Sequence, residues 1–389
     1  MSDRASGSPD PFGLRSLDVA TLRRRAGKKW QARRAPFAAW VADMDFPVAP
    51  AITDALRAVV DAGTFGYADW GEPNPLSPAG KLFAPRMAER FGWEVRPDRV
   101  RDLVDVLQGV RATVLHLSRP GDGVVLHMPA YFPFLDTVSR MDRRLVPVEL
   151  RDGAFDYDAL EAELAASGAS IWILCNPHNP LGHVFGRHEL ERVAEIAARF
   201  DLTVVSDEIH ADLTLPGGVH VPFESLGADV SARTVTLTSS SKAFNLAGLR
   251  WAVMHCGSDR MLAAFDALPG HYLGAPNLMA VTATVAAWTG GDAWLQAVLA
   301  VLDENRHALS GLLERHLPGV GYRPPAATYL CWLDCTALGL GTDPAATFAE
   351  RGVALSAGCD FGPQGAGHVR LNLATSPAVL EQIVVAMAG

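Results

Sequence analysis

Short apolar runs alternate with stretches of helical period between residues 100 and 255, and this alternation constrains the fold more than any other feature. The runs have the length of buried strands: 100–104, 123–128, 145–150, 170–175, 202–206, 234–237 and 251–255. Helical periodicity fills most of the intervals, for example 157–166 and 188–200. Apolar strands joined by helices are typical of a parallel sheet that is covered on both faces. The sequence therefore predicts an α/β fold with a mainly parallel, seven-stranded sheet between helices.

The two ends of the chain have a different pattern. Before residue 63 the sequence predicts a helix at 50–62, and near the C-terminus it predicts two long helices at 277–288 and 292–316. The remainder mixes short strands and helices. We therefore expect a large domain at 63–290 and a smaller α+β domain built from residues 14–62 and 291–389. The polar residues 1–13 are expected to be disordered.

Composition narrows the functional classes. The net charge of −9 argues against nucleic acid as a partner, because phosphate binding requires a basic face. No apolar stretch near ~20 residues is uninterrupted, so no membrane span is expected. The first residues lack the apolar run of a signal peptide. The five cysteines show neither a Cys-x-x-Cys pair nor zinc-type spacing, so we expect reduced thiols, no bound metal and a cytoplasmic location.

A basic segment lies at 22–34, with seven arginines and lysines and no acidic residue. It has two interpretations: an anion-binding arm, or the solvated face of a helix and its flank. The second is the more common origin of a charge run, and we expect it here. The next stretch, 40–50, starts apolar and contains two prolines. Trp40 and Asp45 within it are expected to pack in a loop rather than bind a ligand.

The residues that follow the predicted strands carry most of the reactive side chains. In open α/β sheets ligands bind at the carboxyl ends of the strands, so these positions should meet at one edge. They supply amide, carboxylate, imidazole, hydroxyl, amine and phenol groups: Asn179, Asp207, His210, Ser239, Lys242, Tyr131 and, at a helix start, Asp105. A lysine considered alone is usually solvated. A lysine held in a cleft with a lowered pKa is instead a nucleophile for a carbonyl group.

This set of side chains suits a flat, phosphorylated, cationic ring that carries an aldehyde, which describes pyridoxal phosphate. A carboxylate such as Asp207 can keep the pyridine nitrogen protonated, and the ring is then an electron sink. An asparagine can donate to the phenolate oxygen, and an aromatic side chain can stack on the ring. The phosphate requires serine hydroxyls, an arginine or the N–H groups of a helix N-terminus.

Several of these residues stand in longer motifs. They are WVADMDFP (40–47), PAYFPF (129–134), LCNPHNPLG (174–182), SDEIHADL (206–213), SSSKAFNLAGL (239–249) and GHVRLNLA (367–374). With these motifs the chain resembles the fold-type I pyridoxal-phosphate enzymes of the aspartate aminotransferase superfamily. Within that superfamily it is most similar to the branch of MalY/PatB-like cystathionine β-lyases, or C–S lyases. The resemblance extends from about residue 22 to the end of the chain.

The resemblance implies a role for each residue around the cofactor ring. Lys242 would bond covalently to the aldehyde and then act as general base on the Cα proton of the substrate. Asp207 would pair with the pyridine nitrogen, and Asn179 would bond to the ring oxygen. Tyr131 would stack on the ring. His210 occupies a position near the ring oxygen where aminotransferases often carry tyrosine.

The resemblance also implies contacts at the phosphate and the substrate. Ser239 and Arg250 would bind the phosphate. Tyr67 resembles a tyrosine that reaches the phosphate of the neighbouring subunit, which implies a homodimer. Arg370 resembles the arginine that binds the α-carboxylate of a small amino-acid substrate with two hydrogen bonds, a geometry that lysine provides poorly.

One position departs from the family pattern. Asp105 stands where the phosphate loop of the family has glycine. The backbone N–H groups of Val106 and Leu107 can still bind the phosphate, because that contact needs no side chain. A carboxylate close to the anion nevertheless indicates a divergent subgroup.

The predicted activity is β-elimination on an L-cysteine S-conjugate such as cystathionine, which yields a thiol, pyruvate and ammonia. An aminotransferase on the same scaffold is the main alternative, since it would share the lysine, aspartate and arginine. The SDEIH motif, without the aspartate-to-tyrosine spacing of aminotransferases, favours the lyase. An alternative of another class is a regulatory protein that binds pyridoxal phosphate and acts through protein contacts.

Overall fold

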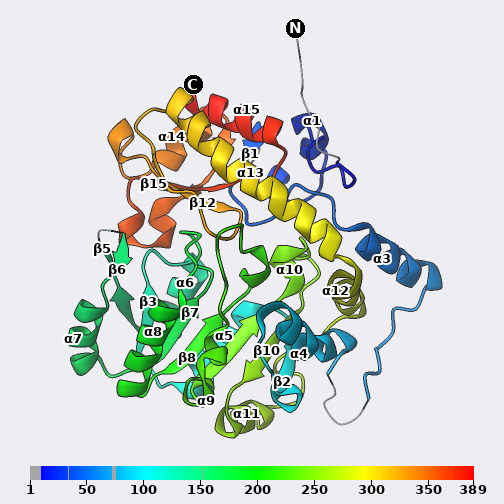
Figure 1. Cartoon of the computed structure of the whole chain (residues 1–389), viewed down its shortest axis with the longest axis vertical. Helices are drawn as coiled ribbons and strands as arrows, with labels where there is room; N and C mark the ends of the chain where they lie inside the picture. The colour runs from blue at the N-terminus through cyan, green and yellow to red at the C-terminus, as the bar shows by residue number, and fades with distance from the viewer. Residues whose placement is uncertain (1–9, 34, 72–75, 152) are drawn as a thin grey trace.

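The computed structural model describes residues 10–33, 35–71, 76–151 and 153–389. Its centre is a seven-stranded sheet of order β2-β10-β9-β8-β7-β3-β4 (Figure 1). The strands are β2 (Val100–Leu103), β3 (Gly123–His127), β4 (Arg144–Val148), β7 (Ala169–Cys175), β8 (Thr203–Asp207), β9 (Thr234–Thr238) and β10 (Ala252–Cys256). All neighbours pair in parallel except β10, which is antiparallel to both β2 and β9. The predicted mainly parallel, seven-stranded sheet is confirmed.

Helices cover both faces of this sheet because successive strand residues point to opposite sides. In β3, Val124 and Leu126 belong to one core and Val125 to the other. The first core is closed by α5 (Val106–Leu117), α6 (Phe132–Arg140) and α11 (Asp259–Asp266). The second is closed by α7 (Tyr157–Ser167) and α8 (Arg187–Arg199). With both faces covered, the loops at the strand ends are where a ligand can enter.

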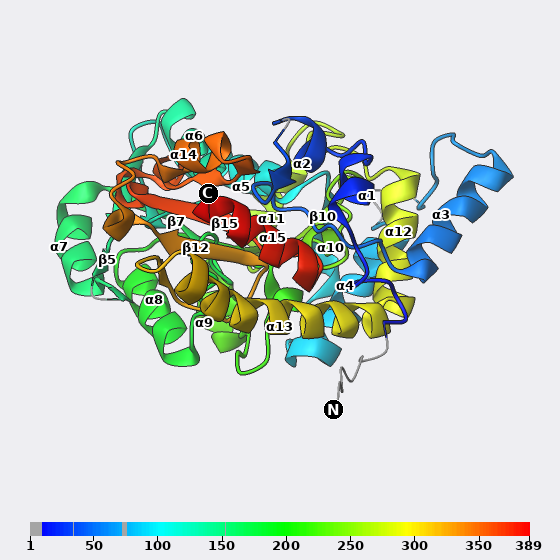
Figure 2. The same ribbon diagram turned by 90° about the horizontal axis from the view of Figure 1, so that it is seen from above.

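A smaller antiparallel sheet lies next to the large one (Figure 1, Figure 2). Its order is β11-β12-β15-β14, and its strands are β11 (Gly321–Tyr322), β12 (Leu330–Asp334), β14 (Ser356–Ala357) and β15 (His368–Asn372). The helices of this part are α13 (Asp292–His316), α14 (Pro344–Glu350) and α15 (Pro377–Ala388). An N-terminal and a C-terminal part of the chain meet here, since β1 (Phe37–Ala38) pairs in parallel with β13 (Val353–Ala354). The exact domain boundaries stay a prediction.

Three helices pack together beside the large sheet: α3 (Pro50–Ala62), α4 (Pro78–Phe91) and α12 (Leu278–Gly290). In the described part of the chain no single helix is long and apolar enough to cross a membrane. The consecutive helices α12 and α13 meet the length and composition criteria only as a pair, with a bend of 80° between them. Their apolar residues belong to the core of the protein.

Two expectations for the N-terminal region need revision. Residues 1–9 of the segment predicted to be disordered lie outside the described residues, but 10–13 form a turn. The Asp10 carboxylate orders that turn by accepting hydrogen bonds from the N–H groups of Leu14 and Arg15, at 2.7 and 2.9 Å. The basic segment is not simply a solvated helix face. Lys29, in α2 (Lys28–Gln31), is only 4% exposed, because it forms an ion pair with Asp45 at 2.9 Å.

Candidate active site

A cavity opens at the carboxyl ends of β7, β8 and β9. Its lining residues come from six loops and helix ends: Ala42, Val104, Asp105, Val106, Leu107, Tyr131, Cys175, Asn179, Asp207, Ile209, His210, Ser239, Ser241, Lys242, Ala247, Arg250 and Trp251. Every cofactor contact predicted from the sequence is in this set except Tyr67. The structure thus brings nearly all the predicted residues together at one edge of the sheet.

The sheet topology explains why the residues converge. Cys175, Asp207 and Leu237 are neighbours across β7, β8 and β9, so the loops after these strands begin side by side. The antiparallel strand β10 lies between β9 and β2 and runs the opposite way. Arg250, which precedes β10, therefore lies at the same edge as Asp105, which follows β2. A parallel β10 would place Arg250 at the far end of the sheet.

Lys242 projects into the cavity from α10 (Ser240–Ala243), the short helix that follows β9. Its Nζ donates a hydrogen bond to the Ala42 carbonyl at 2.9 Å. Burial lowers the pKa of Lys242, although the nearby carboxylates of Asp43 and Asp207 oppose the shift. A lowered pKa increases the fraction of neutral amine, which is the nucleophilic form. The lysine is therefore suited to attack a carbonyl group.

Asp207 ends β8 and is 4% exposed. Its Oδ1 accepts a hydrogen bond from the Ile209 N–H at 3.1 Å. Burial raises the pKa of Asp207 to about 7, and the neighbouring Glu208 charge adds to the shift. A cationic N–H group bound against this carboxylate would favour the ionised form. The site thus fits the protonated ring nitrogen of the predicted cofactor.

Asn179 and Arg370 are joined by a hydrogen bond. The Arg370 Nη1 donates to Asn179 Oδ1 at 3.0 Å, which leaves the amide N–H₂ of Asn179 to donate elsewhere. Arg370 is 3% exposed and is not among the residues that line the cavity. Its Nη2 donates to the Trp40 carbonyl and the Ser356 hydroxyl, at 2.9 and 3.2 Å. Burial lowers the pKa of Arg370 to about 10, so it stays charged near neutral pH.

Tyr131 and His210 both line the cavity in neutral form. Burial raises the pKa of the Tyr131 phenol. Burial also lowers the pKa of His210 to about 3, and the charges of Lys242 and Arg370 add to this effect. His210 lies edge-on to the ring of Tyr329, with 6.4 Å between ring centroids. A neutral imidazole can accept or donate one hydrogen bond without adding charge to the site.

Asp105, the residue that departs from the family pattern, lies at the end of the cavity formed by α5. Asp105 caps α5, since its Oδ1 accepts a hydrogen bond from the Gln108 N–H at 2.8 Å. Its Oδ2 forms an ion pair with Arg250 Nη1 at 2.7 Å. The N–H groups of Val106 and Leu107, in the first turn of the helix, have no intrahelical acceptor. This end therefore offers N–H donors and an arginine, together with one carboxylate.

The predicted phosphate ligand Ser239 lines the cavity, and its hydroxyl donates to the Trp251 carbonyl at 2.6 Å and accepts from the Ser241 N–H at 3.0 Å. Ser241 and Ala42 were missed from the sequence. Ser241 also lines the cavity, and its place in the SSSK motif was a signal that could have found it. The Ala42 carbonyl that binds Lys242 lies in the WVADMDFP motif, but a backbone carbonyl has no sequence signal of its own.

Tyr67 does not lie in the cavity of its own chain. It is fully exposed in the segment after α3, together with Phe65 at 63% exposure. The predicted contact of Tyr67 with a neighbouring subunit is not tested by a single chain.

Comparison with known proteins identifies the class. Residues 104–387 match the family Aminotransferase class I and II, and the chain belongs to this family. A putative cystathionine β-lyase of Mycobacterium tuberculosis (strain H37Rv) is 38% identical over 97% of this chain and 98% of its own length. Cystathionine β-lyase PatB of Bacillus subtilis is 37% identical over 88% and 89%. The resemblance inferred from the sequence motifs is confirmed.

A solved structure agrees with these relatives. The putative PLP-dependent β-cystathionase of Corynebacterium diphtheriae superposes with a TM-score of 0.89. It is 30% identical and covers 96% of this chain and 97% of its own. The likeness therefore extends over the smaller sheet as well as the large sheet.

Proposed function

We propose that this chain is a pyridoxal-phosphate-dependent C–S β-lyase that cleaves L-cysteine S-conjugates, such as cystathionine, to a thiol, pyruvate and ammonia. The observation that carries the proposal is a lysine of lowered pKa in one cavity with Asp207, Asn179 and Tyr131. The relatives named as cystathionine β-lyases select this reaction among those of the family.

The residues of the cavity fit the cofactor. When bound, pyridoxal phosphate supplies an electron sink that stabilises negative charge at the Cα of the substrate. Asp207 is placed to hold the protonated ring nitrogen, and the free N–H₂ of Asn179 to donate to the ring oxygen. Tyr131 offers a ring face for stacking. His210, neutral and buried, is a further polar group that lines the cavity.

The phosphate contacts are assigned to the other end of the cavity. Arg250 supplies the charge, and the N–H groups of Val106 and Leu107 supply donors at a helix N-terminus. Ser239 and Ser241 lie at the same end. In a homodimer Tyr67 would add a hydroxyl from the neighbouring subunit, and its full exposure in the single chain supports this assignment.

In the reaction, the protein binds the substrate, moves a proton and releases the thiol. Arg370, which reaches the edge of the cavity through its hydrogen bond to Asn179, is assigned to the α-carboxylate, and this contact would orient the Cα–H bond toward Lys242. The neutral Lys242 amine accepts the Cα proton, and the Ala42 carbonyl then receives a hydrogen bond from the ammonium. The Cβ–S bond breaks with its electron pair leaving on sulfur, and the sulfur takes up the proton that Lys242 had accepted, so that a thiol leaves and the neutral amine is restored. The remaining three-carbon fragment hydrolyses to pyruvate and ammonia.

The free cysteines agree with a cytoplasmic location. Cys175, Cys256, Cys331 and Cys335 are buried thiols and Cys359 is an exposed one. An exposed free thiol is most compatible with a reducing compartment.

A product assay tests the proposal. The enzyme, loaded with pyridoxal phosphate and mixed with cystathionine but no keto acid, should release pyruvate and a thiol in equal amounts. If neither product forms with cystathionine or a panel of cysteine conjugates, the lyase assignment is wrong. Conversion of the cofactor to its amine form, reversed by a keto acid, would establish the aminotransferase alternative instead.

A further inference from the structure

Residues 40–46, here called the strap, run past the cavity and bind two predicted site residues through backbone carbonyls. The Ala42 carbonyl accepts hydrogen bonds from Lys242 Nζ at 2.9 Å and from the Tyr329 hydroxyl at 2.8 Å. The Trp40 carbonyl accepts one from Arg370 at 2.9 Å. The amine and the guanidinium of the site are thus held by the same short stretch of backbone.

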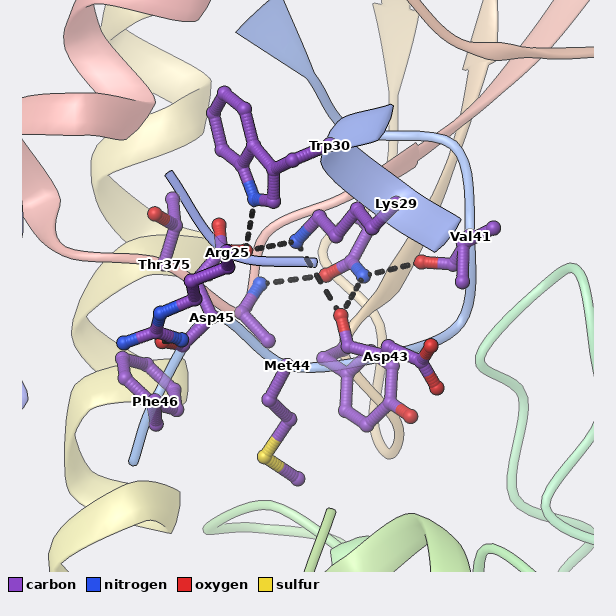
Figure 3. Close-up of polar contacts among 12 residues, drawn as sticks. Arg25, Lys29, Trp30, Val41, Asp43, Met44, Asp45, Phe46 and Thr375 are labelled. Atoms are coloured by element: carbon purple, nitrogen blue, oxygen red, sulfur yellow. Dashed lines mark hydrogen bonds and ion pairs between the residues drawn. The ribbon is translucent and has the colours of Figure 1, made fainter. Parts of the chain in front are cut away.

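The basic segment holds the other end of the strap (Figure 3). Lys29 Nζ lies 2.9 Å from Asp45 Oδ1 and donates to the Asp43 carbonyl at 3.3 Å. The indole N–H of Trp30 donates to the same Asp45 oxygen at 2.7 Å. Arg25 donates to the Asp45 carbonyl. The side chains of Lys29 and Asp45 are only 5% and 2% exposed, so the pair is shielded from water and salt.

The small sheet provides a further attachment of the strap. The amide of Asn372 donates to the carbonyls of Val41 and Asp43, at 2.6 and 2.7 Å. Asn372 and Arg370 are two residues apart in β15 and therefore project from the same face of the sheet. One face of a strand thus carries both the predicted carboxylate ligand and a support for the strap.

Stability alone does not account for the ion pair. Removing two charges from water costs several kcal/mol per ion, and a well-packed apolar pair of similar volume is often at least as stable. A buried ion pair instead fixes the position of the backbone that carries it, because its hydrogen bonds form only over a narrow range of distances and angles. Asp45 Oδ2 is buried and has no hydrogen-bond partner among the described residues, so the pair is not optimised for stability.

We propose that Lys29 and Asp45 are positioning residues of the active site. Their ion pair fixes the strap, and the strap sets the Ala42 carbonyl against Lys242 and the Trp40 carbonyl against Arg370. Arg25, Lys29 and Trp30 of the basic segment therefore hold the strap in place. The inference rests on the proposed function only for the identity of the substrate. The hydrogen bonds from Lys242 and Arg370 to the strap lie within the protein and do not depend on the substrate.

The first test is Lys29→Met in the cofactor-loaded enzyme. It should shift the pH at which the absorbance of the bound cofactor changes, because that pH reports the protonation of the Lys242 nitrogen. It should also weaken the binding of a non-reacting amino acid such as glycine by roughly 10–100-fold, the scale expected for a small misplacement of site groups. Both readouts work without C–S cleavage, so they remain informative if the lyase assignment fails.

The double variant Lys29→Met/Asp45→Leu separates position from stability. It removes both charges, so its unfolding midpoint should recover relative to Lys29→Met. The shifted absorbance profile and the weakened glycine binding should persist. If the double variant instead regained the original absorbance profile and glycine affinity, the ion pair would contribute only to stability and the proposal would be overturned.

Arg143→Met is the matched control. Arg143 is also a buried cation that donates to backbone carbonyls, those of Val114, Ser118 and Met141. It lies at the amino end of β4, across the sheet from the cavity. This variant should lose stability and keep the absorbance profile and glycine affinity of the original chain. Equal changes in Arg143→Met and Lys29→Met would contradict the assignment of a positioning role.

Discussion

The site contains two arginines whose surroundings differ. The Arg250 side chain is 60% exposed, and its charge is already balanced by the Asp105 carboxylate at 2.7 Å. Arg370 is 3% exposed and donates to neutral acceptors: an amide oxygen, a backbone carbonyl and a hydroxyl. Among the described residues no carboxylate lies within 4.0 Å of it.

The difference indicates two ways of binding an anion. At Arg250 an incoming phosphate enters a solvated region that already contains a negative charge, so no single contact there is strong. At Arg370 an incoming carboxylate meets a buried cation without a counter-ion, where charge–charge interactions are weakly screened. Selectivity for the substrate should therefore depend on Arg370, and retention of the cofactor on the sum of several contacts.

The largest expected effect comes from Arg370→Met. Binding of amino-acid ligands should weaken by roughly 30–1,000-fold, since loss of a buried charged partner costs about 2–4 kcal/mol. The ligand-free protein should also lose stability, because the buried oxygens of Asn179, Trp40 and Ser356 lose their hydrogen-bond donor. Glycine titration and thermal unfolding measure the two effects.

Two further variants sharpen this result. Arg370→Lys should not restore ligand binding, because an ammonium cannot form the paired hydrogen bonds of a guanidinium. Arg250→Met should lower cofactor retention and change glycine affinity much less. If Arg250→Met weakens glycine binding as strongly as Arg370→Met, the proposed division between the two arginines is wrong.

Asp207 extends the comparison to a buried anion. Its pKa is about 7 in the folded protein against an ordinary value of 3.8, so between these pH values the folded chain binds more protons than the unfolded chain. Stability of the cofactor-free protein should therefore fall as the pH rises from about 4 to 7, by at most about 1.4 kcal/mol per unit.

Urea unfolding at several pH values checks this slope. Asp207→Asn should remove it, because the amide does not titrate. Bound cofactor should reduce it, since a cationic ring nitrogen favours the ionised carboxylate. A slope that is unchanged in Asp207→Asn would assign the pH dependence to another group.

The sequence located the centre of the site because it follows from local patterns. Asp207 directly follows an apolar run, Asn179 and Lys242 come within five residues of one, and the ends of parallel strands meet at one edge. The direction of β10 has no such local signal. A short apolar strand can pair either way, so the strand pattern did not predict the contact between Arg250 and Asp105, and only the family resemblance placed both residues near the phosphate.

The role of the basic segment was also beyond prediction. Charge runs usually face water, and the sequence of 22–34 gives no sign that Lys29 is buried. Its partner Asp45 lies on a loop whose path is set by contacts with β15, far away in the sequence. Burial of a charged side chain depends on such tertiary contacts, and the hydrophobic periodicity of the sequence does not predict it.

The smallest expected effect concerns Asp105→Asn. Asparagine caps a helix about as well as aspartate, so the substitution removes the charge and preserves the start of α5. Repulsion of the phosphate should fall and Arg250 should be released from its partner. Affinity for the cofactor should then rise only a few-fold, because the pair is partly exposed and such pairs are worth about 0–1 kcal/mol.

Salt dependence distinguishes this charge effect from a change in shape. The gain in Asp105→Asn should be largest at low ionic strength and shrink as salt is added, since salt screens exposed charges. Asp98→Asn is the control, because it removes an exposed ion pair with Arg96 outside the cavity and should leave cofactor affinity unchanged. Weaker cofactor binding by Asp105→Asn at low salt would instead mean that Asp105 holds Arg250 in its phosphate-binding position. In that case the Asp105 carboxylate would support phosphate binding. Arg250 and Arg370 would then differ in how their guanidinium groups are oriented rather than in whether their charge is balanced.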